Sequence, residues 1–213
     1  MERKQRTGFA MFGEMEISRL EGTVISSFFP EGKDMTIKEI IRRIDYSYER
    51  VNSALKSLNE KKFVQEKKVG KTLVYYLDMQ NLYSEIGFGH YMLGREIDFI
   101  KKHRSLYNAI KEIRDNPFIE MVVLFGSYSK GTESNQSDVD IICISNKKKE
   151  IEHFVRSLKY KYNLEFNPIV LSMHKFPDIK KDNLELWNDL KMYGIVFKGD
   201  DPFYYWMYKD EKN

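Results

Sequence analysis

The spacing of apolar residues predicts two short helices within residues 36–62. In IKEIIRRI the isoleucines recur every three or four residues, and Thr36 and Glu39 stand at the two positions of a capping box. After a turn at Asp45-Tyr46, Ser47 is a candidate N-cap for a second helix in SYERVNSALKSLNEKK. The residues expected on its apolar face are Val51, Ala54, Leu55 and Leu58.

The flanking segments complete an ordered set of elements. The stretch EISRLEGTVISSFF, residues 16–29, predicts a helix before these two. After them come two β-prone runs, FVQEKK and KTLVYYL, joined through the turn-like pair Val69-Gly70. The predicted order is therefore helix, helix, helix, hairpin.

That order resembles a winged helix-turn-helix domain over about residues 14–78. The resemblance implies that the helix from Ser47 enters the major groove of DNA and that the hairpin lies against phosphates. The DNA-contacting residues it implies are Ser47, Arg50, Asn52, Ser53, Lys56, Lys67, Lys68 and Lys71. The alternative is a dimerisation or protein-docking module, a use to which winged helices are also put.

Residues 79–118 predict one or two helices that end at Asn116-Pro117. Within them GFGHYMLG, residues 87–94, has a glycine pattern like that of a phosphate loop, but it lacks the third glycine and a preceding strand. We interpret it as a junction between helices.

Composition and charge exclude few function classes. The chain of 213 residues is 42% hydrophobic and 31% charged, with a net charge of +3 whose excess falls within residues 1–80. This asymmetry allows nucleic-acid binding without requiring it. No apolar run is long enough to span a membrane, and residues 1–12 lack the apolar core of a secretory signal, so we expect a cytoplasmic protein. The single cysteine, Cys143, excludes an internal disulfide and is expected to be buried.

The chemistry-bearing stretch is FGSYSKGTESNQSDVDIICIS, residues 125–145. The apolar run before it, FIEMVVLF, predicts a buried strand that ends at Gly126-Ser127. Gly126 and Gly131 have the spacing that opens a P-loop, but Thr132 stands where its lysine belongs, which argues against that site. What remains is a glycine turn whose hydroxyl and backbone N–H groups suit an anionic oxygen.

Ten residues separate Ser127 from Asp138, and Asp140 follows two positions later in an apolar strand. Residues two apart on a strand project to the same side. Two like charges held together repel, and a divalent cation relieves that repulsion. Carboxylates together with phosphate oxygens are the ligands that Mg²⁺ prefers. The pair therefore predicts Mg²⁺ and a nucleotide.

Gly-Ser, ten residues and then Asp-Val-Asp, between two strands, resembles the signature of the polymerase-beta-like nucleotidyltransferases and of their minimal branch. The resemblance implies that Asp138 and Asp140 bind Mg²⁺, with Mn²⁺ as an alternative, and that Gly126 and Ser127 hold the phosphates of an NTP. Lys130 stands where a basic residue is usual; it contacts phosphate or is a solvated loop lysine.

A third carboxylate is usual in that family on a neighbouring strand. In NLEFNPIVLS the matching position is Asn167, and Glu165 lies two residues earlier, on the same side of the strand. Either Glu165 takes the catalytic role of the third carboxylate, or Asn167 occupies its place and is a poor base.

The predicted fold class is α+β, with three parts: a winged helix domain at residues 1–80, a helical connector at 81–117 and a nucleotidyltransferase domain with a small mixed sheet at 118–213. We expect transfer of NMP, with ATP as the favoured donor, and a homodimer. Minimal nucleotidyltransferases of this kind often act as antitoxins that add AMP to a toxin protein. The alternatives are a winged-helix regulator that only senses a nucleotide and an adenylyltransferase similar to aminoglycoside-modifying enzymes.

Overall fold

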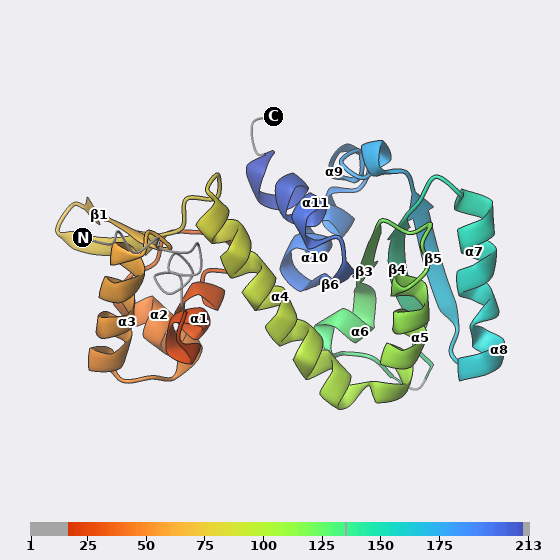
Figure 1. Cartoon of the computed structure of the whole chain (residues 1–213), viewed down its shortest axis with the longest axis horizontal. Coiled ribbons are helices and arrows are strands. Elements are labelled where there is room, and N and C mark those ends of the chain that lie inside the picture. The colour runs from red at the N-terminus through yellow and green to blue at the C-terminus, as the bar shows by residue number, and fades with distance from the viewer. Residues whose placement is uncertain (1–16, 135, 211–213) are drawn as a thin grey trace, which may run out of the picture. The chain divides into compact units, whose positions relative to one another are not determined.

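The computed structural model describes residues 17–134 and 136–210 and divides the chain into two compact units (Figure 1). The first unit ends at Tyr91 and the second begins at Met92. The expectation about a signal segment at residues 1–12 lies outside the described residues. Within the described ranges, no helix is both long and apolar enough to cross a membrane.

The first unit contains three helices followed by an antiparallel hairpin. Its elements are α1 (Arg19–Ser26), α2 (Ile37–Ile44), α3 (Tyr48–Glu60), β1 (Gln65–Val69) and β2 (Thr72–Tyr76). This confirms the predicted order of elements. Met35 adds a short bridge to Tyr75, so the segment before α2 lies beside the hairpin.

The start of α2 follows the sequence closely. The Thr36 hydroxyl accepts the Glu39 N–H at 3.3 Å, and the Glu39 carboxylate accepts the Thr36 N–H at 2.7 Å, which confirms the predicted capping box. Ser47 stands at the N-cap of α3 with extended backbone, but its side chain makes no capping hydrogen bond. The sequence therefore predicted the N-cap position of α3 correctly, but the side-chain hydrogen bond expected of an N-cap serine is not formed.

The apolar face of α3 is buried as the spacing predicts, because Val51, Leu55 and Leu58 are fully enclosed and Ala54 nearly so. Its other side carries exposed polar residues. Glu21 of α1 fixes the C-terminal part of α3, since its carboxylate accepts hydrogen bonds of 2.7 Å from both Ser57 and Lys61.

Helix α4 (Leu82–Lys102) is continuous through GFGHYMLG, so the helix junction predicted there is wrong. The break comes at His103, before α5 (Arg104–Arg114). Within this stretch Gly87 allows a close approach to α1, and Gly22 of α1 allows a close approach to His90. A Cβ built on Gly87 would stand 2.4 Å from Cγ2 of Ile25, and one on Gly22 would stand 2.5 Å from the His90 ring.

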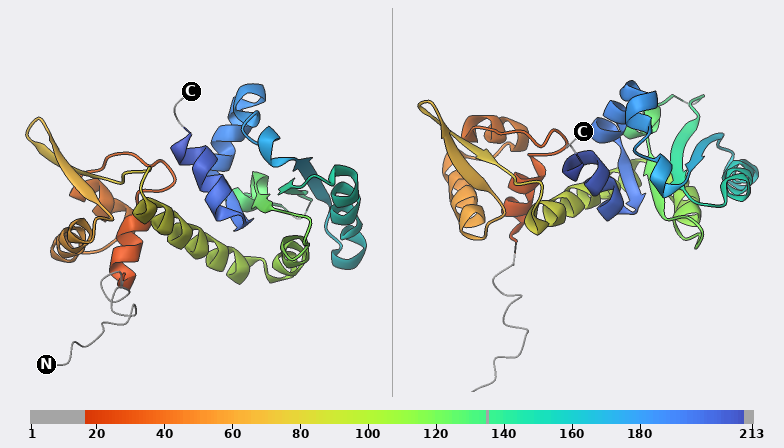
Figure 2. Two further views of the ribbon diagram at one scale, coloured as in Figure 1. Left: turned by 45° about the horizontal axis from the view of Figure 1, so that its top comes forward. Right: turned by 90° about the horizontal axis from the view of Figure 1, so that it is seen from above.

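The second unit is built on a four-stranded mixed sheet in the order β5-β4-β3-β6 (Figures 1 and 2). The strands are β3 (Met121–Leu124), β4 (Val139–Ile144), β5 (Phe166–Leu171) and β6 (Ile195–Lys198). β3 runs antiparallel to both β4 and β6, while β4 and β5 are parallel. The small mixed sheet flanked by helices confirms the expected α+β class, and β6 was not predicted.

Besides α5, the second unit contains further helices between and after its strands. They are α6 (Gly126–Lys130), α7 (Lys148–Ser157), α8 (Lys159–Tyr162), α9 (Ile179–Asp182), α10 (Leu184–Tyr193) and α11 (Asp200–Tyr204), with a 3-10 turn at Met173–Lys175 and a π-helical turn at Tyr205–Lys209. The apolar faces of α5 and α7 pack on one face of the sheet.

That packed face takes the odd positions of β4, including Val139, Ile141 and Cys143. Burial raises the pKa of the Cys143 thiol to about 12, so it is a small apolar side chain, as expected. Because side chains alternate along a strand, the even positions of β4 project to the opposite face. This alternation decides where Asp140 points.

Candidate active site

The end of β3 and the start of β4 lie side by side. The two strands pair antiparallel with Leu124 opposite Ile141, and the Phe125 N–H donates to the Asp140 carbonyl at 3.0 Å. The Gly-Ser pair that follows β3 is therefore held against the aspartate that β4 carries, although the two are distant in sequence.

Gly126 is in direct contact with Asp140. It has φ +72°, and a Cβ built on it would stand 2.2 Å from Oδ2 of Asp140. A side chain at this position would therefore meet both backbone strain and the carboxylate. Only glycine lets the start of α6 approach Asp140 so closely.

The two aspartates differ in their setting. Asp140 lies within β4 and is partly buried, whereas Asp138 precedes the strand and is exposed. The prediction that both lie inside the strand is therefore wrong for Asp138, because β4 begins at Val139, whose N–H donates to the Glu165 carbonyl at 2.8 Å. Val139 is buried in the core between them. Alternation along the chain directs the two carboxylates to the side away from that core.

The position of the third carboxylate is occupied by an amide. The parallel register of β4 and β5 sets Asp140 beside Asn167, and the Asn167 side-chain N–H donates to Oδ1 of Asp140 at 3.0 Å. Glu165 precedes β5, its side chain is 65% exposed, and its carboxylate accepts from Lys159 of α8 at 3.4 Å. Of the two residues weighed from the sequence, the one that contacts Asp140 is thus Asn167.

Ser127 and Lys130 both belong to α6. Ser127 is partly buried, and its carbonyl accepts the Thr132 N–H at 3.0 Å. Lys130 donates to Asp189 of α10 at 2.6 Å, and this hydrogen bond raises the pKa of the lysine. Its ammonium also lies 5.2 Å from the centre of the Tyr193 ring. Lys130 is therefore held toward α10 in this structure.

Arg95 of α4 is a residue to which no sequence motif points. Its guanidinium donates to the carbonyls of Ser129, Tyr193 and Gly194 at 3.2, 2.8 and 2.9 Å. It thereby ties the end of α6 to the turn between α10 and β6. Carbonyl recognition of this kind leaves no motif, because any residue supplies the acceptor.

The donor set suits a cation shared with a substrate. Across residues 17–134 and 136–210, no three His, Cys, Asp or Glu side chains gather closely enough to hold a metal ion by themselves. Mg²⁺ is commonly bound through one or two carboxylates while substrate phosphates and waters complete its shell. Asp138 and Asp140, on one side of the chain, fit that arrangement.

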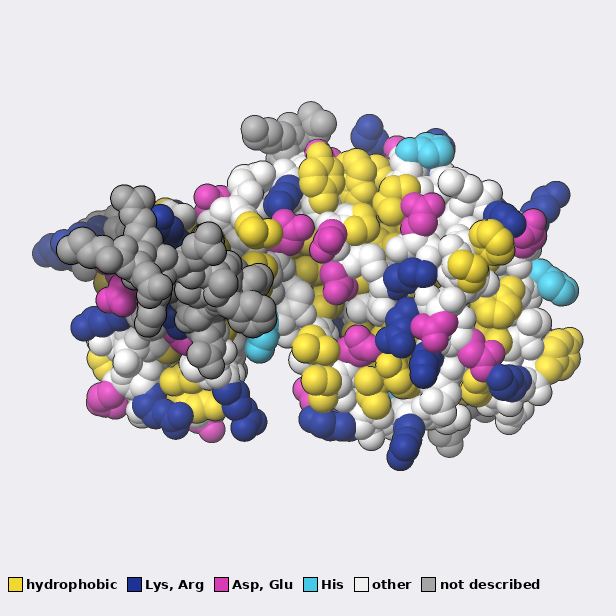
Figure 3. All heavy atoms as spheres, in the orientation of Figure 1, with side chains coloured by type: hydrophobic (Ala, Val, Ile, Leu, Met, Phe, Trp, Pro, Cys, Tyr) yellow, Lys and Arg dark blue, Asp and Glu magenta, His cyan; other side chains and the backbone are white. Residues whose placement is uncertain are grey.

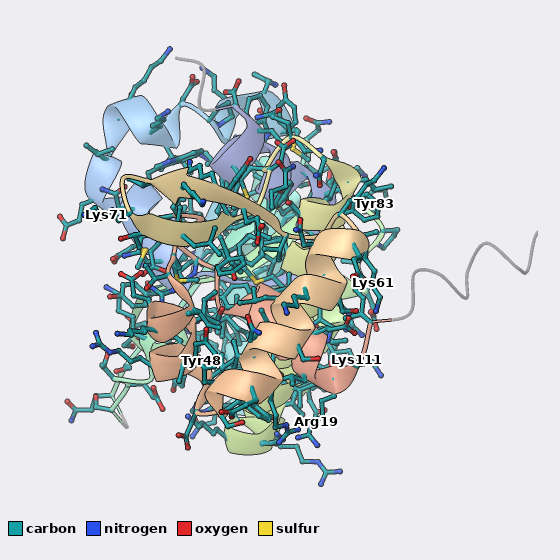
Figure 4. All side chains as sticks on the ribbon, turned by 90° about the vertical axis from the view of Figure 1, so that its left-hand side faces the viewer. Arg19, Tyr48, Lys61, Lys71, Tyr83 and Lys111 are labelled. Atoms are coloured by element: carbon teal, nitrogen blue, oxygen red, sulfur yellow. The ribbon has the colours of Figure 1, made fainter. Side chains whose placement is uncertain are left out.

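The residues proposed for DNA contact lie on α3 and the hairpin of the first unit. Figure 4 shows α3 between Tyr48 and Lys61, and Lys71 at the tip of the hairpin. The exposed members of the set are Ser47, Arg50, Ser53, Lys56, Lys67, Lys68 and Lys71, and Asn52 is partly buried. Two have partners in the chain: Lys67 lies 2.6 Å from Asp34, and the Arg50 guanidinium lies 4.8 Å from the centre of the Tyr46 ring.

Charge on the second unit is mixed. On its face drawn in Figure 3, basic and acidic side chains are interspersed. That face offers no continuous basic track of the kind that nucleic-acid binding uses.

Comparison with known proteins gives a match to a protein family. Residues 107–200 match the model of a protein family described as Polymerase beta, Nucleotidyltransferase. The matched range contains β3, α6, β4 and β5 and so includes Gly126, Asp140 and Asn167. No curated protein and no solved structure matches the chain. The match indicates transfer of a nucleoside monophosphate in general.

Proposed function

We propose that the protein is a Mg²⁺-dependent nucleotidyltransferase that transfers NMP, with AMP from ATP as the favoured case, to a protein or another acceptor. The observation that carries the proposal is the contact between Gly126 and Asp140 inside the range that matches the nucleotidyltransferase family. Backbone N–H groups and a hydroxyl at a glycine turn suit phosphate oxygens, and a carboxylate beside them suits a cation shared with those phosphates.

Different residues of the site bind the phosphates and the cation. Gly126 and Ser127 hold the β- and γ-phosphates, Lys130 adds a positive charge beside them, and Asp138 and Asp140 hold the cation. Mg²⁺, or Mn²⁺ as an alternative, supplies neutralisation of the triphosphate charge when it is bound. Asp140 is oriented for this task by Asn167 on one side and by Gly126 on the other. The acceptor then attacks the α-phosphorus, and pyrophosphate leaves in line.

The first unit acts as a winged helix-turn-helix domain that binds DNA. Support comes from the order of its elements and from the exposed polar face of α3, with Arg50, Ser53 and Lys56 directed to solvent. In this proposal α3 enters the major groove and Lys68 and Lys71 of the hairpin lie against phosphates.

Together the two activities suit an antitoxin that modifies a cognate toxin protein and represses its own operon as a homodimer. A second candidate is a winged-helix regulator that senses a nucleotide without transferring it. Asn167 favours this candidate, because a neutral amide replaces the carboxylate that nucleotidyltransferases usually place beside the catalytic pair.

Label transfer tests the proposal. Purified protein with Mg²⁺ and each α-labelled NTP in turn, in an extract of its own cells, is compared with the Asp138→Asn/Asp140→Asn double variant. A matched control is Asp182→Asn, which alters an exposed carboxylate on α9 of the same unit.

The proposal predicts a labelled product with the wild type and the control, and none with the double variant. No label with any NTP, while calorimetry still detects Mg²⁺-dependent nucleotide binding, would leave the sensing regulator. A label that persists in the double variant would remove both carboxylates from the site.

A further inference from the structure

The residue beside Asp140 limits which acceptors the site can use. A hydroxyl acceptor must lose its proton during attack, and a positioned base typically accelerates such a step by about 10²–10⁴-fold. Asn167 holds the place beside Asp140 and uses its N–H as a donor at 3.0 Å. A neutral amide has no capacity to take a proton at neutral pH.

Glu165 is poorly disposed to replace it. Its carboxylate faces Lys159 of α8, at 3.4 Å, and the side chain is 65% exposed. α8 continues from α7 at Leu158, a residue of the core on the sheet face opposite Asp140. The ion pair therefore draws Glu165 toward the α7–α8 side and away from the carboxylate pair.

The same substitution also leaves the site one negative charge short. Where a carboxylate stands beside the pair, the cation has three anionic oxygens from the protein. Here Asp138 and Asp140 supply two, and the side-chain amide of Asn167 supplies none. An acceptor that carries its own negative oxygen would restore that charge and would need no base.

We infer that the acceptor attacks with an oxygen that is already ionised at neutral pH, namely the oxygen of a phosphate monoester or of a carboxylate, and not with a hydroxyl group. This inference rests on the proposed nucleotidyl transfer. The hydrogen bond between Asn167 and Asp140 is the observation that restricts the acceptor to this chemical class.

The reaction balances without a proton acceptor. The anionic oxygen forms a bond to the α-phosphorus of the NTP, and the bond between that phosphorus and the oxygen bridging to the β-phosphorus breaks. Pyrophosphate leaves with the electron pair. The product is a phosphoanhydride when the acceptor is a phosphate and a mixed acyl phosphate when it is a carboxylate.

The linkage in the labelled product is the first test. Wild-type protein, Mg²⁺ and α-labelled ATP are incubated with an extract of its own cells, and the labelled product is isolated. We expect the label to be released from the acceptor by hot dilute acid, which indicates a phosphoanhydride, or by neutral hydroxylamine, which indicates an acyl phosphate.

A label that withstands both treatments is a phosphodiester to a hydroxyl group and overturns the inference while the nucleotidyl transfer stands. The absence of any labelled product, with ATP and with the other NTPs, removes the proposed function itself. The two failures are therefore distinguishable.

The second test changes the residue that carries the argument. Water is a hydroxyl acceptor present in every assay, and its use is measured as hydrolysis of ATP to AMP and pyrophosphate. Asn167→Asp restores a base beside Asp140, so we expect the ratio of hydrolysis to transfer onto the extract acceptor to rise at least about tenfold. Asn167→Gln keeps a neutral amide and should leave that ratio within about twofold.

A uniform rise or fall of both reactions in Asn167→Asp would overturn the inference, because it would show that the position sets cation binding alone. Thermal unfolding of each variant, measured beside the wild type, identifies a loss that comes from misfolding. If a variant is misfolded, the chemical linkage in the wild-type product alone tests whether the acceptor is an ionised oxygen or a hydroxyl group.

Discussion

The side-chain amide of Asn167 donates a hydrogen bond of 3.0 Å to Oδ1 of Asp140, while Gly126 closes on the other oxygen of the same carboxylate. Asn167 belongs to β5, the parallel neighbour of β4, whereas Gly126 begins α6 just after β3, the antiparallel neighbour. Oδ1 of Asp140 is thus contacted from a strand of the sheet, and Oδ2 is approached by the first residue of the helix that follows β3. The proposed nucleotidyl transfer depends on this placement, because a reacting group must be held in a defined geometry.

Gly126 and Gly131 form a matched pair for testing this contact. Both have φ near +70°, but a Cβ on Gly126 meets Asp140, whereas one on Gly131 meets nothing within 4 Å. We expect each alanine variant to lose about 1–2 kcal/mol of unfolding free energy through backbone strain. Only Gly126→Ala should also reduce nucleotidyl transfer, by at least about tenfold, which corresponds to about 1.4 kcal/mol of transition-state stabilisation. Urea unfolding measures the loss of stability, and pyrophosphate release measures the loss of transfer. Equal losses of transfer in Gly126→Ala and Gly131→Ala would contradict a role for the contact with Asp140.

The Lys130–Asp189 pair separates phosphate binding from structural support. Both side chains are about one-third exposed, so the pair contributes at most about 1 kcal/mol to stability. If Lys130 contacts phosphate, Lys130→Met should raise the KM for the NTP by about tenfold, a cost of about 1.4 kcal/mol. Asp189→Asn releases the lysine from its ion pair and should leave KM unchanged or lower it. A rise in KM with both variants would show that the pair acts by holding α6 against α10.

Lys68 and Lys71 should carry the hairpin's share of DNA binding. Lys67 is held 2.6 Å from Asp34, so its charge is already partly neutralised. Removing one lysine–phosphate interaction lowers the salt slope of DNA binding by about 0.9. We therefore expect Lys68→Gln/Lys71→Gln to reduce the slope by about 2 on duplex DNA from upstream of the gene, and Lys67→Gln to reduce it by much less. An unchanged slope in the double variant would remove the hairpin from the interface.

Glu21 should make the first unit sensitive to acid. Burial favours the neutral form of this carboxyl, but hydrogen bonds from Lys61, Ser57 and Ser18 outweigh it and lower its pKa from 4.5 to about 2. A carboxylate with a lowered folded-state pKa contributes stability above its unfolded pKa and loses it as the pH falls toward the folded value. Unfolding free energy should therefore decrease from about pH 4.5 to about pH 2.

Glu21→Gln should remove much of this pH dependence and destabilise the unit at pH 7. The control is Glu60→Gln, which alters an exposed carboxylate at the end of α3. Urea unfolding at neutral and acid pH measures both variants. A Glu21→Gln protein that keeps the wild-type acid profile would show that another group is responsible.

Local patterns predicted the local parts of this fold. The capping box of Thr36 and Glu39, the buried face of α3 and the hairpin around Gly70 each depend on residues a few positions apart, and each is observed. The Gly-Ser and Asp-Val-Asp elements were also recognised in the sequence, and the pairing of β3 with β4 brings them together. The spacing of the two elements along the chain can be read from a single sequence.

Features that depend on distant pairing were not predictable. β6 was missed because Ile195–Lys198 is a short apolar run without turn signals. It forms a strand through its antiparallel pairing with β3, which is distant in sequence. The continuity of α4 was missed because Gly87, Gly89 and Gly94 suggested a break, although Gly87 is required by contact with Ile25. The hydrogen bond between Asn167 and Asp140 follows from the register of two strands, which the sequence leaves open.

The antiparallel pairing of β3 with β4 brings Gly126 to Asp140, through the Leu124–Ile141 pair and the hydrogen bond from the Phe125 N–H to the Asp140 carbonyl. The segment from Gly131 to Asp138 connects the two strands but does not set this approach. The approach of Gly126 to Asp140 is thus set by strand pairing and not by the length of the interval between the two signature elements. Residues inserted at Ser134, an exposed position, would lengthen this loop without moving the strands that carry the site.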